Sequence, residues 1–138
     1  MGVVTMIITL NSSKLSDWKC LEENEELEKA QVVTDSLRVT KYSYFLQELH
    51  ASFNYFSDFP QCLTLRLTTL RCLALNCNSL TSIPCLEGMT SLTQLDLANN
   101  RIHKIENLHH LPSLEVLNLR SNKITVLENI SATLQWYR

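Results

Sequence analysis

The chain has 138 residues, of which 45% are hydrophobic and 19% are charged, and its formal net charge at pH 7 is −2. This composition is typical of one folded domain and excludes a chain too polar to form a core. The slight acidic excess argues against a nucleic-acid-binding protein, which normally carries many more bases than acids. Five cysteines without paired C-x-x-C spacing argue against a disulfide framework and a zinc site.

The first feature along the chain is an apolar run at residues 2–10, GVVTMIITL. It has no basic flank, and it is much shorter than the about 20 residues that a membrane-spanning helix needs. We therefore expect neither a membrane segment nor a secretory signal in this run. Unpaired cysteines fit a reducing compartment, so the sequence predicts a cytoplasmic protein.

An acidic helix is expected next, over about residues 13–30. A serine would cap its start, and Leu15, Trp18 and Leu21 would form its apolar side. The glutamates of residues 22–28 suit a solvated face. Two interpretations remain open, an acidic docking segment and a cap over the edge of the structure that follows, and we favour the cap.

Residues 32–44, VVTDSLRVTKYSY, indicate a strand or a degenerate repeat. Together with the expected helix, this segment makes residues 1–45 an N-terminal flank or cap. The sequence leaves open whether the flank joins the structure that begins at residue 46.

A repeated pattern begins at residue 46, in which L-x-x-L-x-L is followed by an asparagine and then by apolar residues at every third position. Successive units are 22 residues apart, except that the first unit is two residues longer. FSDFP at 56–60 and LTSIP at 80–84 occupy equivalent positions and support this alignment. The units are 46–69, 70–91, 92–113 and 114–130.

The spacing within a unit predicts its local structure. Alternating leucines point to one side of a short strand. An asparagine suits the turn that follows, because its amide can donate to and accept from backbone groups that the turn leaves unpaired. Apolar residues at every third position fit a 3₁₀ or irregular helix. A single unit cannot bury its apolar side chains, so we expect the units to stack and share one core.

The units resemble the leucine-rich repeat over about residues 46–130. Their 22-residue length and the endings IENL at 105–108 and LENI at 127–130 resemble the SDS22-like subclass. The resemblance implies an α/β fold, a right-handed solenoid with a curved parallel sheet on its concave face and 3₁₀ or irregular helix on its convex face. It also implies a structural asparagine ladder formed by Asn54, Asn78, Asn100 and Asn122.

Catalysis is not expected from the residues present. The chain has two glycines, and it contains neither a G-x-S-x-G motif nor a phosphate-binding loop. The polar cluster of His103, Glu106, His109 and His110 falls at outward positions of the convex side, with no further metal ligand predictable nearby. We therefore predict a protein that is not an enzyme and has no cofactor and no metal site.

The concave face is the expected binding surface. Stacking the repeats aligns the outward strand residues in rows of mostly polar, small side chains, and repeat proteins use such exposed sheets for recognition. The predicted partner-binding residues are His50, Asn76, Gln94, Asp96, Asn118 and Arg120. The expected partner is a protein rather than a nucleic acid or a membrane.

The function predicted on these grounds is a non-catalytic interaction scaffold. The resemblance implies as partners the protein phosphatase 1 catalytic subunit or cytoskeletal and axonemal proteins, with a location at the cytoskeleton or cilium within the cytoplasm. One alternative is the substrate-recognition part of a larger enzyme or ubiquitin-ligase chain. Residues 131–138 depart from the repeat and predict a truncated C-terminal tail. A truncated isoform without independent function is therefore the other alternative.

Overall fold

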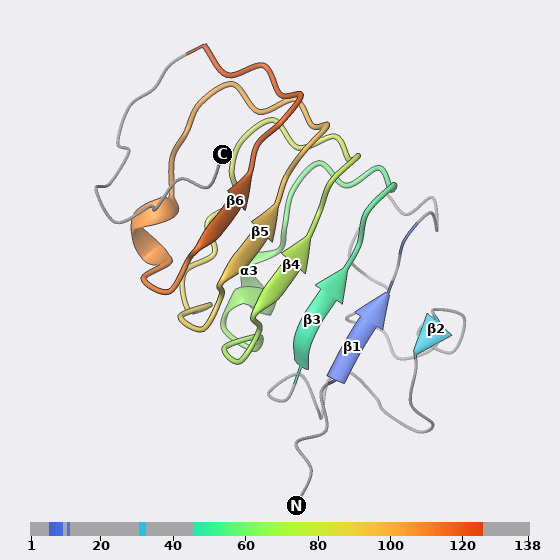
Figure 1. Cartoon of the computed structure of the whole chain (residues 1–138), viewed down its shortest axis with the longest axis vertical. Coiled ribbons are helices and arrows are strands. Elements are labelled where there is room, and N and C mark those ends of the chain that lie inside the picture. The colour runs from blue at the N-terminus through green and yellow to red at the C-terminus, as the bar shows by residue number, and fades with distance from the viewer. Residues whose placement is uncertain (1–5, 10, 12–30, 33–45, 126–138) are drawn as a thin grey trace, which may run out of the picture.

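The computed structural model describes residues 6–9, 11, 31–32 and 46–125 (Figure 1). The helix expected at 13–30, most of the segment at 32–44, the end of the last repeat and the tail at 131–138 lie outside the described residues. Among the residues that the structure describes, none of the helices has the length and the apolar character needed to span a membrane.

The described strands form one six-stranded sheet in the order β2-β1-β3-β4-β5-β6. Figure 1 shows β3 to β6 side by side, with the chain returning on one side of the sheet between successive strands. We call each strand with its return segment a coil. The strands are β1 (Met6–Thr9), β2 (Gln31–Val32), β3 (Leu46–His50), β4 (Cys72–Ala74), β5 (Gln94–Asp96) and β6 (Val116–Asn118), and the return segments carry α3 (Gln61–Thr64) and η2 (Leu108–His110).

The strands from β3 to β6 are parallel, and their register follows the sequence repeat. Leu49 pairs with Leu73, Leu73 with Leu95, and Leu95 with Leu117. Equivalent residues of successive repeats therefore lie next to one another across the sheet. The longer first unit keeps the same register, because its additional length lies in the return segment that contains α3.

One hydrophobic core lies between the sheet and the return segments. The leucines of the central strands are fully buried, and so is Phe56, the largest of the fully buried side chains. Burial of each large apolar side chain stabilises the fold by roughly 1.5–3 kcal/mol. Leu117, Leu119 and Ile124 pack against this core but are only partly buried.

Asn100 links its own coil to the preceding one. Its side-chain amide donates to the carbonyl oxygen of Leu97 in its own coil and to that of Leu75 in the coil before, both at 3.0 Å. Its Oδ1 accepts the backbone N–H of Leu80 at 3.0 Å. One buried side chain thereby supplies hydrogen bonds to backbone groups of two coils, which would otherwise be costly to bury.

Asn78 and Asn122 make the same three kinds of bond in their coils. Asn54 donates to the carbonyl oxygens of Ala51 and Ser52 in its own coil. The asparagine positions of the repeat thus run along the described coils as a series of backbone-binding amides.

The residue before each of these asparagines has a left-handed backbone. The φ angles are 57° at Phe53, 56° at Cys77, 54° at Asn99 and 56° at Ser121. This conformation turns the chain away from the sheet, and for residues other than glycine and asparagine it costs roughly 1–2 kcal/mol. We call these four turns, at residues 53, 77, 99 and 121, the corners of the coils. Local backbone strain is thus present at three of them, where the residue is neither glycine nor asparagine.

We expect Ser121→Asn to stabilise the protein by about 0.5–1 kcal/mol, because asparagine tolerates the left-handed conformation and already occupies the equivalent position at Asn99. Ser121→Val should destabilise it, since β-branched residues are the least tolerant of positive φ. Urea unfolding followed by circular dichroism measures both changes. Equal stability of the two variants would contradict this account of the corner.

The sheet begins before the first repeat, which the sequence did not indicate. β1 comes from the apolar run at residues 2–10 and pairs in parallel with β3, and β2 pairs antiparallel with β1. Asn11 follows β1, and its Oδ1 accepts the backbone N–H of Ser52 at 2.7 Å. A part of the N-terminal flank therefore extends the sheet and contacts the first corner.

Candidate protein-binding face

We call the side of the sheet that points away from the core the open face. Alternation along each strand places its residues, and the parallel register arranges them in two rows. All of them are partly or fully exposed, whereas the leucines between them on β3, β4 and β5 are buried. One row is Glu48, Cys72, Gln94 and Val116, and the next is His50, Ala74, Asp96 and Asn118.

The third row follows the strands and is less accessible than the repeat suggests. Ser52 and Ala98 are buried, with 4% and 5% of their surface exposed. Asn76 is half-buried, and its Oδ1 accepts a hydrogen bond from the Ser52 hydroxyl. In this row only Arg120 is exposed. Apart from Arg120, the accessible side chains of the open face therefore lie on the strands rather than after them.

The six residues expected to bind a partner do not form one cluster. Asp96 and Asn118 are direct neighbours on β5 and β6. Gln94 and Arg120 are exposed beside them, at the start of β5 and after β6. His50 lies on β3, with β4 between it and Asp96, and Asn76 follows β4.

Asp96 and Asn118 are held in place by their own backbone. Asp96 Oδ1 accepts the N–H of Ala98 at 3.0 Å, and Asn118 Oδ1 accepts the N–H of Arg120 at 3.1 Å. Such local bonds fix the side-chain direction at the end of each strand. The second oxygen of Asp96 and the amide of Asn118 are thus presented at defined positions, which lowers the entropy cost of binding.

A second polar group lies at the β3 end of the face. Glu48 Oε2 and His50 Nε2 are 3.1 Å apart, with about a third of each side chain exposed. Pairs this exposed contribute roughly 0–1 kcal/mol, so this pair orients two side chains more than it stabilises the fold. Glu48 and Asp96 flank Cys72 from the two neighbouring strands.

The surroundings of Cys72 raise the pKa of its thiol, first through burial and then through the nearby carboxylates of Glu48 and Asp96. The thiolate is the reactive form, so Cys72 should alkylate slowly at neutral pH. We expect Asp96→Asn to lower this pKa and to speed alkylation of Cys72 by iodoacetamide. Peptide mass spectrometry of timed reactions follows this single site, and an unchanged rate would contradict the electrostatic contribution of Asp96.

Three exposed large hydrophobic side chains lie on β6 or shortly after β3: Val116 at 46%, Phe53 at 57% and Tyr55 at 60%. Val116 points outward because it alternates with the inward Leu117 of β6. The sequence did not predict the exposure of Tyr55. It lies between the buried Asn54 and Phe56, at a position outside the alternation of a strand. Exposed aromatic groups of this size are favoured as contacts in protein interfaces.

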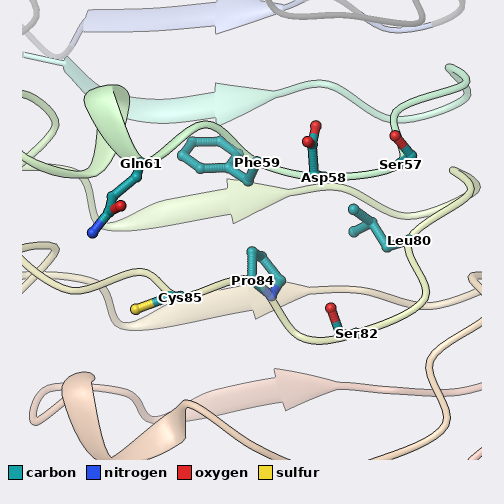
Figure 2. A pocket seen from close by; sticks show the side chains of 8 residues that line it. All are labelled: Ser57, Asp58, Phe59, Gln61, Leu80, Ser82, Pro84 and Cys85. Atoms are coloured by element: carbon teal, nitrogen blue, oxygen red, sulfur yellow. The ribbon is translucent and has the colours of Figure 1, made fainter.

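A pocket of about 240 Å³ lies on the return segments of the first two repeats (Figure 2). Asp58 and Cys85 are the titratable groups of its lining, and Figure 2 shows them apart, with the Cys85 sulfur directed away from Asp58. The lining thus offers no pairing of a nucleophile with a base. Its residues are Ser57, Asp58, Phe59, Gln61, Leu80, Ser82, Pro84 and Cys85.

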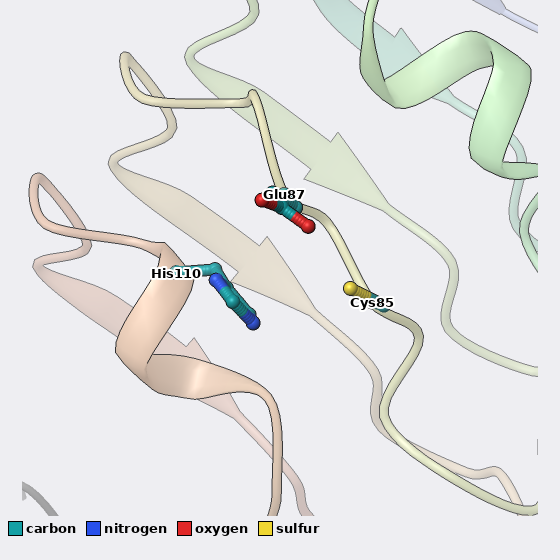
Figure 3. Close-up of side chains that lie close together, drawn as sticks. All are labelled: Cys85, Glu87 and His110. Atoms are coloured by element: carbon teal, nitrogen blue, oxygen red, sulfur yellow. The ribbon is translucent and has the colours of Figure 1, made fainter.

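The return segments also gather a mixed cluster of Cys85, Glu87 and His110 (Figure 3). The sequence alone did not bring His110 together with Cys85 and Glu87, because these two residues lie in the preceding coil. The other members of the predicted polar group, His103 and His109, are exposed, and Glu106 is half-buried.

Residues 68–110 and 90–132 each match the family model described as Leucine Rich repeats (2 copies). This part of the chain is similar to leucine-rich repeats, and the parallel sheet with very little helix among the described residues fits the fold that such repeats build. Leucine-rich repeats generally mediate protein–protein interaction and are typically not catalytic. A comparison with curated proteins found no match.

Proposed function

We propose that the chain is a non-catalytic scaffold that binds a protein partner through the open face. In this proposal the coils form a right-handed solenoid, with the open face on its concave side and residues 1–45 as its N-terminal cap. The observation that carries the proposal is the pair Asp96 and Asn118, adjacent on β5 and β6 and held by bonds to their own backbone.

The chemistry of the open face favours a partner segment that is polar and charged. The backbone groups of the inner strands are already paired within the sheet, so recognition rests on side chains. Asp96 suits a basic group of the partner, and the exposed Arg120 suits an acidic one. Val116, at the start of β6 and with 46% of its surface exposed, adds an apolar contact.

The first partners to test follow from the resemblance to the SDS22-like subclass. They are the protein phosphatase 1 catalytic subunit and cytoskeletal or axonemal proteins, and either would place the protein in the cytoplasm, at the cytoskeleton or at the cilium. The 22-residue spacing of the matched units supports this choice.

A face variant tests the proposal by changing charge while keeping the local backbone bonds. Asp96→Asn and Asn118→Asp each retain an Oδ1 that can accept the same backbone N–H, and Arg120→Glu reverses the exposed charge. The matched control is Arg101→Glu, an exposed position outside the three rows with the same change in net charge. Circular dichroism checks that both variants fold like the wild type.

Each protein then serves as bait in affinity purification with mass spectrometry, and purified phosphatase catalytic subunit is titrated directly. We expect a partner that the wild type and the control retain and the face variant loses, with affinity at least about tenfold weaker. Recovery of the same partner by all three baits would contradict binding at the open face. Absence of phosphatase binding would remove that partner alone.

A further inference from the structure

Three side chains able to bind a metal converge on the return segments of two successive coils. Cys85 and Glu87 lie between β4 and β5, and His110 lies in η2, between β5 and β6. One ligand atom from each lies within 4.8 Å of the others. Cys85 and His110 are half-buried and Glu87 is exposed, and Figure 3 shows the three side chains near one another on two neighbouring return segments.

We propose that Cys85, Glu87 and His110 form a binding site for Zn²⁺. Thiolate, imidazole and carboxylate are the three side-chain groups that bind zinc in proteins, whereas Mg²⁺ and Ca²⁺ prefer oxygen ligands alone. Zinc–ligand distances of about 2.0–2.3 Å in a tetrahedron bring donor atoms to roughly 3.3–3.7 Å from one another. The donor atoms already lie within 4.8 Å of one another, so zinc binding would bring any pair closer by at most roughly 1–1.5 Å.

The backbone that carries the ligands is fixed before any metal binds. Asn107 precedes η2 with φ of 63°, and its side-chain amide donates to the carbonyl oxygen of Ile83 at 2.8 Å. Leu108, the first residue of η2, is buried in the core with 7% exposed. These two contacts hold the helix that carries His110 against the coil that carries Cys85.

Gly88 fixes the chain immediately after Glu87. Its φ is +96°, a conformation that side-chain-bearing residues rarely adopt, and a Cβ there would lie 3.0 Å from the carbonyl oxygen of Thr64. The glycine allows the segment to pack closely on the preceding coil. The backbone at His110 and beside Glu87 is thus held by packing against neighbouring coils, which favours a preorganised metal site.

Three protein ligands leave one position of a zinc tetrahedron open, as in sites that hold a water or take a donor from a bound molecule. The ligands lie on the return segments, whereas the proposed protein-binding face lies on the other side of the sheet. The zinc site and the open face are therefore separate features, and each stands or falls by its own test.

The test uses the full-length reduced protein and begins with Co²⁺, which reports its ligands by absorption. We expect one bound Co²⁺ with a thiolate-to-cobalt charge-transfer band and the visible bands of a tetrahedral site, both abolished when Zn²⁺ is added. Zinc affinity is then measured by competition with a chromophoric chelator. Cys85→Ser and His110→Asn should each weaken zinc binding at least about tenfold, because loss of a ligand costs no less than loss of a supporting group.

The matched controls are Cys72→Ser and His103→Asn, which remove a half-buried thiol and an exposed imidazole outside the cluster. Both should bind zinc as the wild type does, and circular dichroism establishes that every variant is folded. A cobalt spectrum without the thiolate band would overturn the proposal. So would wild-type zinc affinity in Cys85→Ser, or an equal loss of affinity in the two controls.

Discussion

Replacement of Asn100 by alanine is expected to destabilise the protein by about 2–4 kcal/mol, a large part of the roughly 5–15 kcal/mol that stabilises a typical domain. The Leu80 N–H loses the acceptor that Asn100 Oδ1 provides. The carbonyl oxygens of Leu75 and Leu97 each lose one donor, although the neighbouring asparagines still donate to them. Most of the cost thus comes from one buried N–H and from the cavity. Urea unfolding measures the change.

Asn122→Ala provides the matched comparison, because Asn122 makes the same bonds at a half-buried position. Water can replace part of what it supplies, so we expect a smaller cost of about 1–2 kcal/mol. Equal effects of the two substitutions would show that burial of the hydrogen bonds does not determine their contribution.

Phe56→Ala should be the most destabilising single substitution in the first coil, at about 3–5 kcal/mol, because the side chain is completely buried and leaves a large cavity. Phe56→Leu should cost only about 1 kcal/mol, since Leu80 fills the equivalent position of the next coil. Thermal unfolding of both variants tests this pair of values.

Phe53→Ala is the control for loss of an aromatic ring in the same coil. Phe53 is 57% exposed, so its removal should change stability by less than about 0.5 kcal/mol. A loss comparable with that of Phe56→Ala would mean that the exposed ring packs against a part of the protein that the described residues do not include.

The register of the sheet could be predicted from the sequence because one feature determines it. The leucines recur at a fixed spacing, and a shift of one residue would move every leucine from the core to the open face. Leu73 and Leu95 therefore pair as the repeat requires. Asn78 and Asn100 likewise occupy repeat positions that bind the backbone at the turn.

What lay outside the repeat could not be predicted in the same way. Met6–Thr9 forms β1 and pairs with β3. This pairing could not be predicted, because the short apolar run lies outside the repeat whose spacing sets the register of the other strands. Cys85 and His110 approach each other because two return segments stack, and the side chains there do not follow the apolar repeat. The burial of Ser52 also depends on contacts with the flank, since its N–H donates to Asn11.

The open face is an intermediate case. Alternation along β5 and β6 sufficed to place Asp96 and Asn118 on the outward side, and the register made them neighbours. Their bonds to the N–H groups of Ala98 and Arg120 were not visible from spacing. Those bonds decide which substitutions change the charge of the open face without disturbing the strand end, so the design of the face variant depended on the structure.

The backward reach of the asparagine bonds has a consequence for how such a protein can change in length during evolution. Asn100 donates to the coil before it as Asn78 and Asn122 do, so each of these three units carries the amide donor for a carbonyl oxygen of its predecessor. Duplication of one whole unit inserts an amide and a carbonyl oxygen together and leaves no amide without its carbonyl. Other lengths are tolerated where the return segment bulges, as it does at α3 in the longer first unit. The chain is thus built to grow by whole units, and to absorb irregularity only on the side away from the sheet.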